Sequence, residues 1–254
     1  MRRLTRRQFL GLGLVALPAA AGIDGRFAEP SWLRVTHFDP RPEPTCRFVQ
    51  FSDFHYKGDA EYAASVVRKS TRSRRSLSAS LGDLVEDKRF APAALDFIRQ
   101  IERPVYGYPG HWDYGSGADF REYEKAFRAT GGEWLEDRSV VLAEQNLELI
   151  GMGLRGVHQL EAAKAPRRLL IIHYPIQADR LEGRRYDLIL AGHSHGGQVR
   201  IPFYGAPVLP YGVGRYQCGR FESLGGPLYV NVGVGTYMFP LRFNCRPEIT
   251  VVGI

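Results

Sequence analysis

Two histidines one residue apart, His193 and His195, directly follow the short apolar run 188–191. Such a run is typical of a strand that is buried on both faces of a layered fold. In α/β proteins, the residues that bind ligands lie beyond the carboxyl ends of such strands. Glycines at 192, 196 and 197 let the backbone turn sharply, so both imidazoles can point toward one centre.

Three further strand-like runs end in residues of the same chemical kind. They are 48–51, followed by Asp53 and His55; 77–81, followed by Asp83; and 169–172, followed by His173. If these strand ends meet at one edge of a sheet, acids and imidazoles come together there. Burying them costs free energy, because carboxylates need cations and imidazoles need partners. A bound divalent metal meets both needs, so the sequence predicts a metal site.

Each of these residues also has an ordinary structural interpretation. Asp53 or Asp83 alone could cap a helix, and His173 alone could be a core histidine whose ring is satisfied by hydrogen bonds. Asp113 could orient a neighbour through a hydrogen bond. We interpret three more residues as structural or exposed: Glu86, Asp87 and His158. A coincidence is a poor explanation for the ordered residues at four strand ends, so we favour a joint site.

The order of elements predicts the fold class. A length of 254 residues allows one large α/β domain or two small ones. Helical patterns alternate with strands in the first half of the chain, at 59–69, 92–101 and 119–130. Strands predominate after residue 134. We therefore expect an α/β fold of two packed mixed β-sheets flanked by helices, a four-layer α/β/β/α sandwich.

The first 21 residues have the pattern of a targeting signal and are set apart from the fold. Four arginines (Arg2, Arg3, Arg6 and Arg7) precede the apolar run 9–16, and small residues follow at 19–21. This pattern predicts a twin-arginine export signal over 1–21. It implies the export machinery as a partner and a place in the periplasm or cell envelope, with membrane-surface contact as an option. A basic arm or an anchoring helix is the alternative, although Pro18 and the glycines disfavour a span.

The basic charge does not predict a nucleic-acid partner. The formal net charge of +7 falls to +3 once the four arginines of the leading segment are set aside. The densest remaining basic cluster is Arg68, Lys69, Arg72, Arg74 and Arg75. No aromatic residues interleave with it to stack bases, and the exposed end of a helix is its ordinary interpretation.

Four elements occur in order along the chain: Asp-x-His, Gly-Asp, a histidine at a strand end, and Gly-His-x-His. They carry a resemblance to the calcineurin-like metallophosphoesterase family, which extends from Phe48 to Ile254. Segments 192–202, 229–235 and 242–249 are similar to an exported or membrane-associated bacterial branch. Enzymes of that kind hydrolyse phosphodiesters or the pyrophosphate of nucleotide-activated lipid precursors. The resemblance implies one metallophosphoesterase domain over 46–254, preceded by an edge strand and a proline-rich connection over 22–45. It also implies a phosphorylated small-molecule or lipid-linked substrate.

The resemblance implies two divalent cations and a set of ligands. It assigns Asp53, His55 and His195 to one cation, Asp83 as a bridge, and His173 and His193 to the other. A bridging carboxylate holds two cations about 3.5 to 4 Å apart, where they clamp phosphoryl oxygens and acidify a shared water that attacks phosphorus. Mixed imidazole and carboxylate ligands favour manganese, with iron or zinc as alternatives.

The chain departs from the family at 110–113, which reads Gly-His-Trp-Asp in place of Gly-Asn-His followed by an acid. In the hypothesis that we favour, His111 replaces the asparagine as a metal ligand and Trp112 packs near the substrate. The leaving group then lacks an acid, because an indole cannot deliver a proton. This would cost about 10²- to 10⁴-fold for poor leaving groups and favour pyrophosphates or aryl phosphates. In the other hypothesis, His111 is the acid and the second metal lacks a ligand.

The missing histidine also suggests a second function. The chain could be a metal-binding but weakly active protein that binds phosphorylated envelope polymers. The loops 114–120, 154–159 and 204–216 are expected to select the substrate, but their residues carry no readable code. The sequence therefore predicts the chemistry of the site better than its substrate.

Overall fold

The computed structural model describes residues 22–254, apart from 41, 72–75, 155–162, 182 and 184. The export signal predicted for 1–21 lies outside these residues and stays a prediction. Arg72, Arg74 and Arg75 of the basic cluster lie outside them too. None of the described helices has both the length and the apolar character that crossing a bilayer requires.

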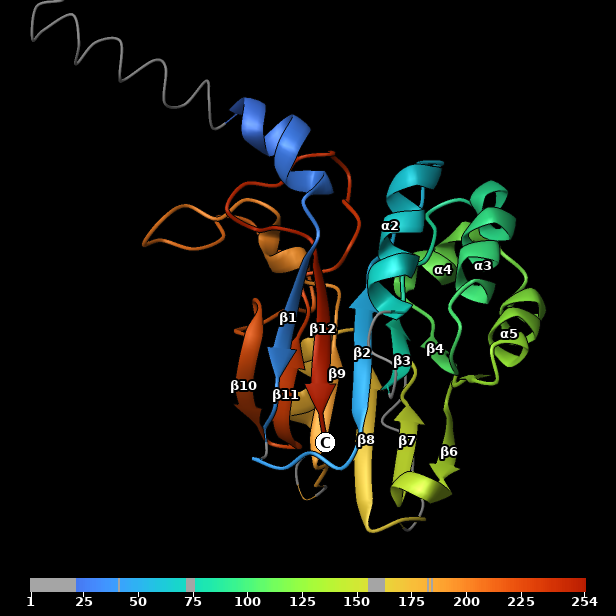
Figure 1. The fold of residues 1–254 in the computed structure, drawn as a ribbon. Helices are drawn as coiled ribbons and strands as arrows, with labels where there is room; N and C mark the ends of the chain where they lie inside the picture. Colours follow the sequence, from blue (N-terminus) through green and yellow to red (C-terminus); the bar gives the residue numbers. More distant parts are fainter. Residues whose placement is uncertain (1–21, 41, 72–75, 155–162, 182, 184) are drawn as a thin grey trace, which may run out of the picture.

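The first sheet contains six described strands in the order β1-β12-β2-β3-β4-β5. Their bounds are β1 Arg34–Phe38, β2 Arg47–Ser52, β3 Ser76–Leu81, β4 Val105–Tyr108, β5 Glu133–Trp134 and β12 Glu248–Gly253. β2, β3, β4 and β5 run parallel, whereas β12 is antiparallel to β2. The parallel pairing brings the carboxyl ends of β2, β3 and β4 to one edge (Figure 1).

The second sheet also contains six described strands, in the order β10-β11-β9-β8-β7-β6. Their bounds are β6 Arg138–Leu142, β7 Leu147–Gly151, β8 Arg167–Ile172, β9 Leu188–Ala191, β10 Gly219–Ser223 and β11 Gly226–Val230. β7, β8, β9 and β11 are parallel neighbours, and an antiparallel strand lies at each edge. Both sheets are therefore mixed, as the sequence predicts.

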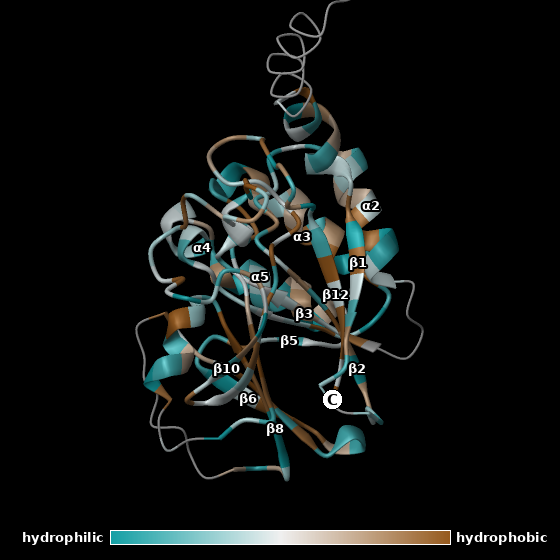
Figure 2. Cartoon of the chain, turned by 90° about the vertical axis from the view of Figure 1, so that its left-hand side faces the viewer, coloured by the Kyte–Doolittle hydropathy of each residue, from teal (hydrophilic) through white to brown (hydrophobic). Residues whose placement is uncertain are grey.

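Alternate residues of the strands enter different layers. Phe48 of β2 packs between the sheets with residues such as Leu169 of β8 and Leu190 of β9. Its neighbour Val49 faces the other way and packs under the helices of the first sheet. The helices in this cluster are α2 Ala60–Thr71, α3 Ala91–Arg99 and α5 Phe120–Ala129, and the short helix α4 His111–Ser116 follows β4. Figure 2 shows the apolar strands beneath them. The predicted α/β sandwich of two mixed sheets flanked by helices is confirmed.

The outer face of the second sheet is covered differently. Among the described residues, its buried cluster joins Leu170 and Ile189 to Ala178 in the 3₁₀-helix η5 Pro175–Arg180 and to the loop residue Tyr216. Two short helical turns, η1 Asp24–Ala28 and η2 Glu29–Ser31, precede β1. β1 lies at the edge of its sheet, as predicted, while the division of the chain at residue 46 stays a prediction.

Local sequence signals account for several elements. The helix predicted at 59–69 forms as α2, and its N-terminus is capped because the Tyr62 amide donates to Asp59 Oδ1 at 2.9 Å. After β9, residues 199–201 form only isolated bridges, from Val199 to Phe243 and from Ile201 to Gly205. The scattered cysteines Cys46, Cys218 and Cys245 are free thiols.

Candidate metal centre

All seven predicted metal ligands converge at one end of the sandwich. Five segments contribute them: the residues after β2, β3, β8 and β9, and the first residue of α4. They form two groups, one of Asp53, His55 and His195 and the other of Asp83, His111, His173 and His193. Within each group, one ligand atom from every residue lies within 4.8 Å of the others. The grouping follows the two predicted sets, with His111 in the second as the favoured hypothesis has it, and the role of each residue as a ligand stays a prediction.

Imidazole nitrogens face each other in the first group. Nε2 of His55 lies 3.1 Å from Nε2 of His195, which is 3.8 Å from Oδ1 of Asp53. All three side chains are buried. Two ring nitrogens at this separation need either a shared proton or a cation between them, because two lone pairs repel. The arrangement therefore fits a cation.

Asp83 connects the two groups. Its Oδ2 lies 3.1 Å from Nδ1 of His111 and 3.2 Å from Nε2 of His173, and it also lies 3.8 Å from Nε2 of His55. This oxygen is buried and accepts no hydrogen bond of good geometry, whereas Oδ1 accepts one from the Trp112 amide at 2.8 Å. An unsatisfied buried carboxylate oxygen is costly. A cation on each side would satisfy it.

The backbone is strained at most of these positions. Five of the seven residues have positive φ: 50° at Asp53, 43° at His55, 52° at Asp83, 66° at His193 and 48° at His195. A non-glycine residue in this region costs about 1 to 3 kcal/mol, and such strain clusters at functional sites. Hydrogen bonds between the strand ends maintain it. The Asp53 amide donates to Gly82 O at 3.1 Å and the His55 amide to Asp83 O at 2.9 Å.

Glycines leave room for the carboxylates. A Cβ at Gly110 would lie 2.0 Å from Oδ1 of Asp83, and one at Gly192 would lie 2.7 Å from Oδ2 of Asp53. Both contacts are shorter than any real Cβ tolerates. The sequence attributed Gly192 to a sharp turn, but its main role is to admit an acid from the opposite sheet.

Neighbouring side chains orient the predicted ligands. Asp113 is buried and accepts hydrogen bonds from the Gly110 and Leu84 amides, each at 2.9 Å, which supports its predicted orienting role. Glu86 Oε1 lies 2.8 Å from Nδ1 of His55. The structural interpretation of Glu86 thus takes a specific form, because this contact directs the other ring nitrogen of His55 toward the group.

The electrostatics of the cluster suit metal ligands. Burial raises the pKa of Asp53. Burial acts in the same direction on Asp83, but His173 and His111 outweigh it and hold the pKa of Asp83 well below its usual range. Burial and the charge of His173 lower the pKa of His193 to about 3, and burial holds the pKa of His195 well below its usual value. Burial lowers the pKa of His173, but the carboxylates of Asp83 and Asp53 outweigh it and raise that pKa to about 9, so this imidazole must lose a proton when it binds a cation. An ionised acid and a neutral imidazole are the forms that bind metals.

A sequence model described as calcineurin-like phosphoesterase matches residues 46–197, which is more than half of the chain. The chain belongs to the calcineurin-like phosphoesterase family. It is accordingly a metallophosphoesterase, a hydrolase of phosphoesters. Family membership and the Asp/His cluster together indicate that it binds divalent metal.

Relatives of similar length support this family. The chain is 28% identical to the uncharacterized metallophosphoesterase YkuE of Bacillus subtilis, over 99% of this chain and 98% of the relative. It is 25% identical to the phosphodiesterase YaeI of Escherichia coli, over 98% of each. A Bos taurus transmembrane protein with a metallophosphoesterase domain is 34% identical over 48% of this chain and 29% of that protein.

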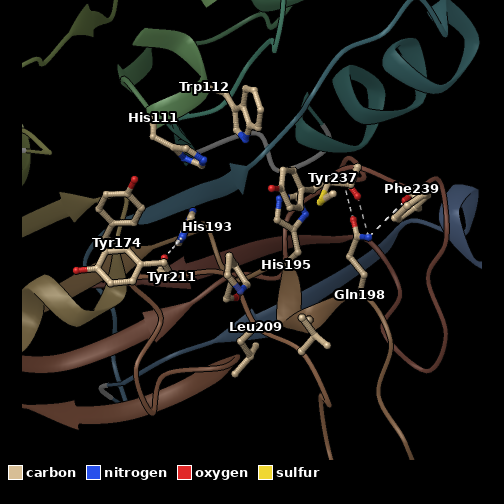
Figure 3. A pocket seen from close by; sticks show the side chains of 15 residues that line it. His111, Trp112, Tyr174, His193, His195, Gln198, Leu209, Tyr211, Tyr237 and Phe239 are labelled. Carbon is tan, nitrogen blue, oxygen red and sulfur yellow. Dashed lines mark hydrogen bonds between the residues drawn. The ribbon is translucent and has the colours of Figure 1, made fainter. Parts of the chain in front are cut away.

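The phosphoesterase site opens into a cavity of about 600 Å³ (Figure 3). His111, His193 and His195 lie at its floor, and Trp112 faces them. Ser194, Gly197 and Gln198 also line it, but most of the remaining wall is aromatic or aliphatic: Tyr174, Val208, Leu209, Pro210, Tyr211, Tyr237, Met238 and Phe239. The described lining residues include no lysine, arginine, aspartate or glutamate. The cavity therefore combines a metal-binding floor with apolar walls.

One of the three loops that the sequence predicts to select the substrate contributes to the walls of the cavity. Residues 208–211 belong to the predicted loop 204–216, whereas no residue of 114–120 lines the cavity, so a part of that loop in substrate selection stays a prediction. Most of the third loop, 154–159, lies outside the described residues. The segment 237–239 was missed. It is held in place by Gln198, which accepts from the Tyr237 amide at 2.5 Å and donates to Tyr237 O at 3.1 Å (Figure 3).

Proposed function

We propose that this metallophosphoesterase is a dinuclear enzyme that hydrolyses phosphodiesters or pyrophosphates with one apolar arm. One observation carries the proposal. The single oxygen Oδ2 of Asp83 faces His55 in one group and His111 and His173 in the other. A shared carboxylate oxygen between two sets of imidazoles is the arrangement that a pair of bridged cations requires. Manganese is the favoured metal, because hard carboxylate and imidazole ligands are combined.

Bound cations would polarise phosphoryl oxygens and supply hydroxide at neutral pH. Asp53, His55 and His195 would hold one cation, and Asp83, His111, His173 and His193 the other. The position of His111 favours the ligand role over the acid role. Its Nδ1 lies 3.0 Å from Nε2 of His173 and 3.1 Å from Oδ2 of Asp83. That nitrogen therefore points into the cluster, where it would meet the cation and not a leaving group.

Trp112 would contact the substrate by donating a hydrogen bond. Its ring lines the cavity, and the indole nitrogen is buried without a hydrogen-bond partner. An orphaned buried donor costs free energy that a substrate oxygen would recover. Because an indole cannot deliver a proton, catalysis should favour leaving groups that need none. Aryl phosphates and pyrophosphates have such groups, and the apolar walls suit an aryl or hydrocarbon arm.

The test is hydrolysis of bis-p-nitrophenyl phosphate with added Mn²⁺. Asp83→Asn should lower kcat/KM at least about 10³-fold, because several kcal/mol of transition-state stabilisation depend on both cations. Its bound metal should fall below the two equivalents of the unmodified chain. Asp119→Asn is the matched control, since Asp119 caps α5 at the surface. Full activity of Asp83→Asn, or turnover that resists chelation, would refute the proposal.

A second candidate function follows from Trp112. A chain that binds two equivalents of metal but turns over no ester or anhydride would be a phosphopolymer-binding protein of the envelope. Export of the folded, metal-loaded chain suits either function, because metal binding is coupled to folding. The envelope location itself rests on the sequence of residues 1–21.

A further inference from the structure

Exposed hydrophobic side chains are concentrated in one part of the molecule. Of the fourteen large ones among the described residues, ten belong to three segments: 22–32, 199–217 and 233–246. These ten are Ile23, Phe27, Trp32, Ile201, Phe203, Tyr204, Val208, Tyr211, Met238 and Phe239. Scattered exposed hydrophobic residues are normal, but a gathering of this size marks an interaction site. We name these three segments the apolar face.

The three segments are held together as one surface. The Arg242 amide donates to Gly25 O at 2.8 Å, and the Arg200 amide donates to Phe243 O at 2.9 Å. The Asn244 amide donates to the buried Glu29 at 2.8 Å. Figure 1 shows the blue N-terminal turns, the orange loop and the red loop beyond the same end of the sheets. The apolar face is thus one continuous surface. It includes residue 22, the first residue that the structure describes.

The charges of the apolar face are almost all positive. Segments 199–217 and 233–246 contain the solvent-accessible Arg200, Arg215 and Arg246 but no acidic residue, and their fourth arginine, Arg242, is buried. In 22–32, Glu29 is buried, so Asp24 is the single exposed acid. Exposed Arg26 lies 5.0 Å over the Phe27 ring and Arg246 lies 3.8 Å over the Trp32 ring. Arginine beside exposed aromatic rings matches an anionic, partly apolar partner.

The mouth of the cavity opens within the apolar face. Val208, Tyr211, Met238 and Phe239 line the cavity, and they are also 74%, 90%, 64% and 68% exposed. The same residues therefore form the rim of the catalytic pocket and part of the outer surface. A partner that covers the apolar face would stand directly above the metal-binding floor.

We propose that the apolar face docks on an anionic lipid bilayer. Its aromatic and aliphatic side chains enter the boundary between headgroups and acyl chains, and its arginines lie among the headgroup phosphates. In the sequence, residues 1–21 directly precede the first segment of this face and contain four arginines, no acid and an apolar run. The docked orientation presents the pocket to phosphodiesters or pyrophosphates anchored in the bilayer, a consequence that rests on the proposed function.

A second copy of the chain fits this face poorly. A twofold dimer would place the same surface on both sides and bring arginine against arginine. The face offers Asp24 alone as an exposed counter-charge. Phe203 stands at the tip of the 199–217 loop with its side chain fully exposed, at 111%. Projecting tips of this kind insert into a soft surface more readily than they pack against a copy of themselves.

Vesicle binding of the full chain tests the docking. The probe is flotation with phosphatidylcholine vesicles that contain phosphatidylglycerol, compared with vesicles of phosphatidylcholine alone. The variant Phe203→Ser with Tyr204→Ser removes two exposed rings that do not line the cavity. The matched control is Val141→Ser with Leu224→Ser, which are 43% and 55% exposed and lie outside the apolar face.

The expected result is strong binding to the anionic vesicles that weakens as salt is raised. The Phe203/Tyr204 variant should lower the partition coefficient at least about tenfold, while the control variant binds like the unmodified chain. Equal binding of the two variants would overturn the proposal, since residues 1–21 alone would then carry the affinity. Absent vesicle binding, or a dimer that the Phe203/Tyr204 variant dissociates, would overturn it as well.

Hydrolysis of soluble bis-p-nitrophenyl phosphate in the same preparations separates the two proposals. The Phe203/Tyr204 variant should retain this activity while losing vesicle affinity. A chain that binds vesicles as expected but hydrolyses nothing would refute the proposed function and leave the docking supported. A chain that hydrolyses the ester but ignores the vesicles would refute the docking alone.

Discussion

The floor and the rim of the pocket are built on opposite principles. At the floor, His193 and His195 are each 4% exposed. They lie just beyond the end of β9, and the backbone of both residues is left-handed. At the rim, Tyr211 and Phe239 are 90% and 68% exposed and belong to loops. Burial and a strained backbone hold the few side chains of the floor in place. The rim is formed by exposed loop residues, which need no such strict placement. Under the proposed function, the floor therefore provides the reaction chemistry and the rim selects the substrate.

Removing metal should have the largest effect, and it should be confined to the floor. Both sheets supply residues to the candidate ligand groups. We expect chelation to abolish hydrolysis and to lower the melting temperature. The stabilising effect of each cation is about 2.7 kcal/mol when it is present at 100 times its Kd. Calorimetry and turnover, measured before and after Mn²⁺ is restored, check this. A chelated chain that melts unchanged would show that chelation removed no tightly bound metal, which would contradict the metal centre.

Substitutions of His111 should have the next largest effect and distinguish its two roles. As a ligand, it should tolerate the family's asparagine, so His111→Asn should retain most activity. His111→Ala should lose about 10²-fold, because the second cation is held less well. The measurement is kcat/KM for a series of aryl phosphodiesters whose leaving groups differ in pKa. If His111 is instead the acid, both variants fall alike, and most for the poorest leaving groups.

Glu86→Gln should have a smaller effect at the floor. Glu86 accepts from Nδ1 of His55 at 2.8 Å and lies 2.9 Å from the ammonium of Lys57. A neutral amide can still accept the hydrogen bond but weakens the ligand, which typically costs about 10- to 100-fold in metal affinity or activity. Titration of activity with Mn²⁺ should show a higher half-saturating concentration. Asp87→Asn serves as the control, since Asp87 caps the following turn at the surface.

The sequence could predict the floor because few residue types can perform its chemistry. Asp53, Asp83 and His193 follow apolar runs whose strand character is plain, and parallel strands deliver their ends to one edge. Glu86 could not be assigned, because a flexible acid in a loop has many ordinary roles. The helix α4 was also missed. Its six residues are held by Asp113 bonding back to Gly110, a tertiary arrangement that the apolar pattern does not reveal.

The rim and the strand order were harder for a physical reason. Gln198 holds Tyr237 across 39 residues, and no local propensity encodes such a contact. The position of β12 between β1 and β2 likewise depends on pairing between the two ends of the chain. Such non-local pairings follow from the whole fold, whereas helix caps and strand ends follow from neighbouring residues.

Rim substitutions should alter substrate preference and leave metal content intact. Phe239→Ser removes an apolar wall at the mouth of the cavity. We expect KM for diesters with an aryl or hydrocarbon arm to rise about tenfold, since loss of one apolar contact is worth about 1 to 3 kcal/mol. The ratio of kcat/KM for an apolar-arm diester over a methyl diester measures this. If kcat/KM fell equally for both diesters, Phe239 would support the reaction itself and would not select the substrate.

Glu248 sharpens the comparison, because it is as buried as the floor but serves no catalytic role. It is 2% exposed and accepts hydrogen bonds from Arg34, Tyr229 and Thr250, at 2.5, 2.6 and 2.7 Å. Burial alone would raise the pKa of Glu248, but the Tyr229 and Thr250 hydrogen bonds and the Arg34 charge lower it below its usual value. Unlike Asp83, this acid is fully satisfied by the protein. We therefore expect Glu248→Gln to leave turnover and metal content unchanged.

The effect of Glu248→Gln should appear in stability and depend on pH. The folded protein stabilises the ionised form of the Glu248 carboxyl group more than the unfolded chain does. This stabilisation is therefore complete above the ordinary glutamate pKa of 4.5 and is lost as pH falls through the lowered folded value. At pH 7 the variant should lose about 1.5 to 3 kcal/mol of unfolding free energy, the range for hydrogen bonds to a charged group. Urea titrations at pH 7 and pH 3 should show the difference shrinking toward acid. A constant difference would mean that shape, and not charge, explains why glutamate occupies this position.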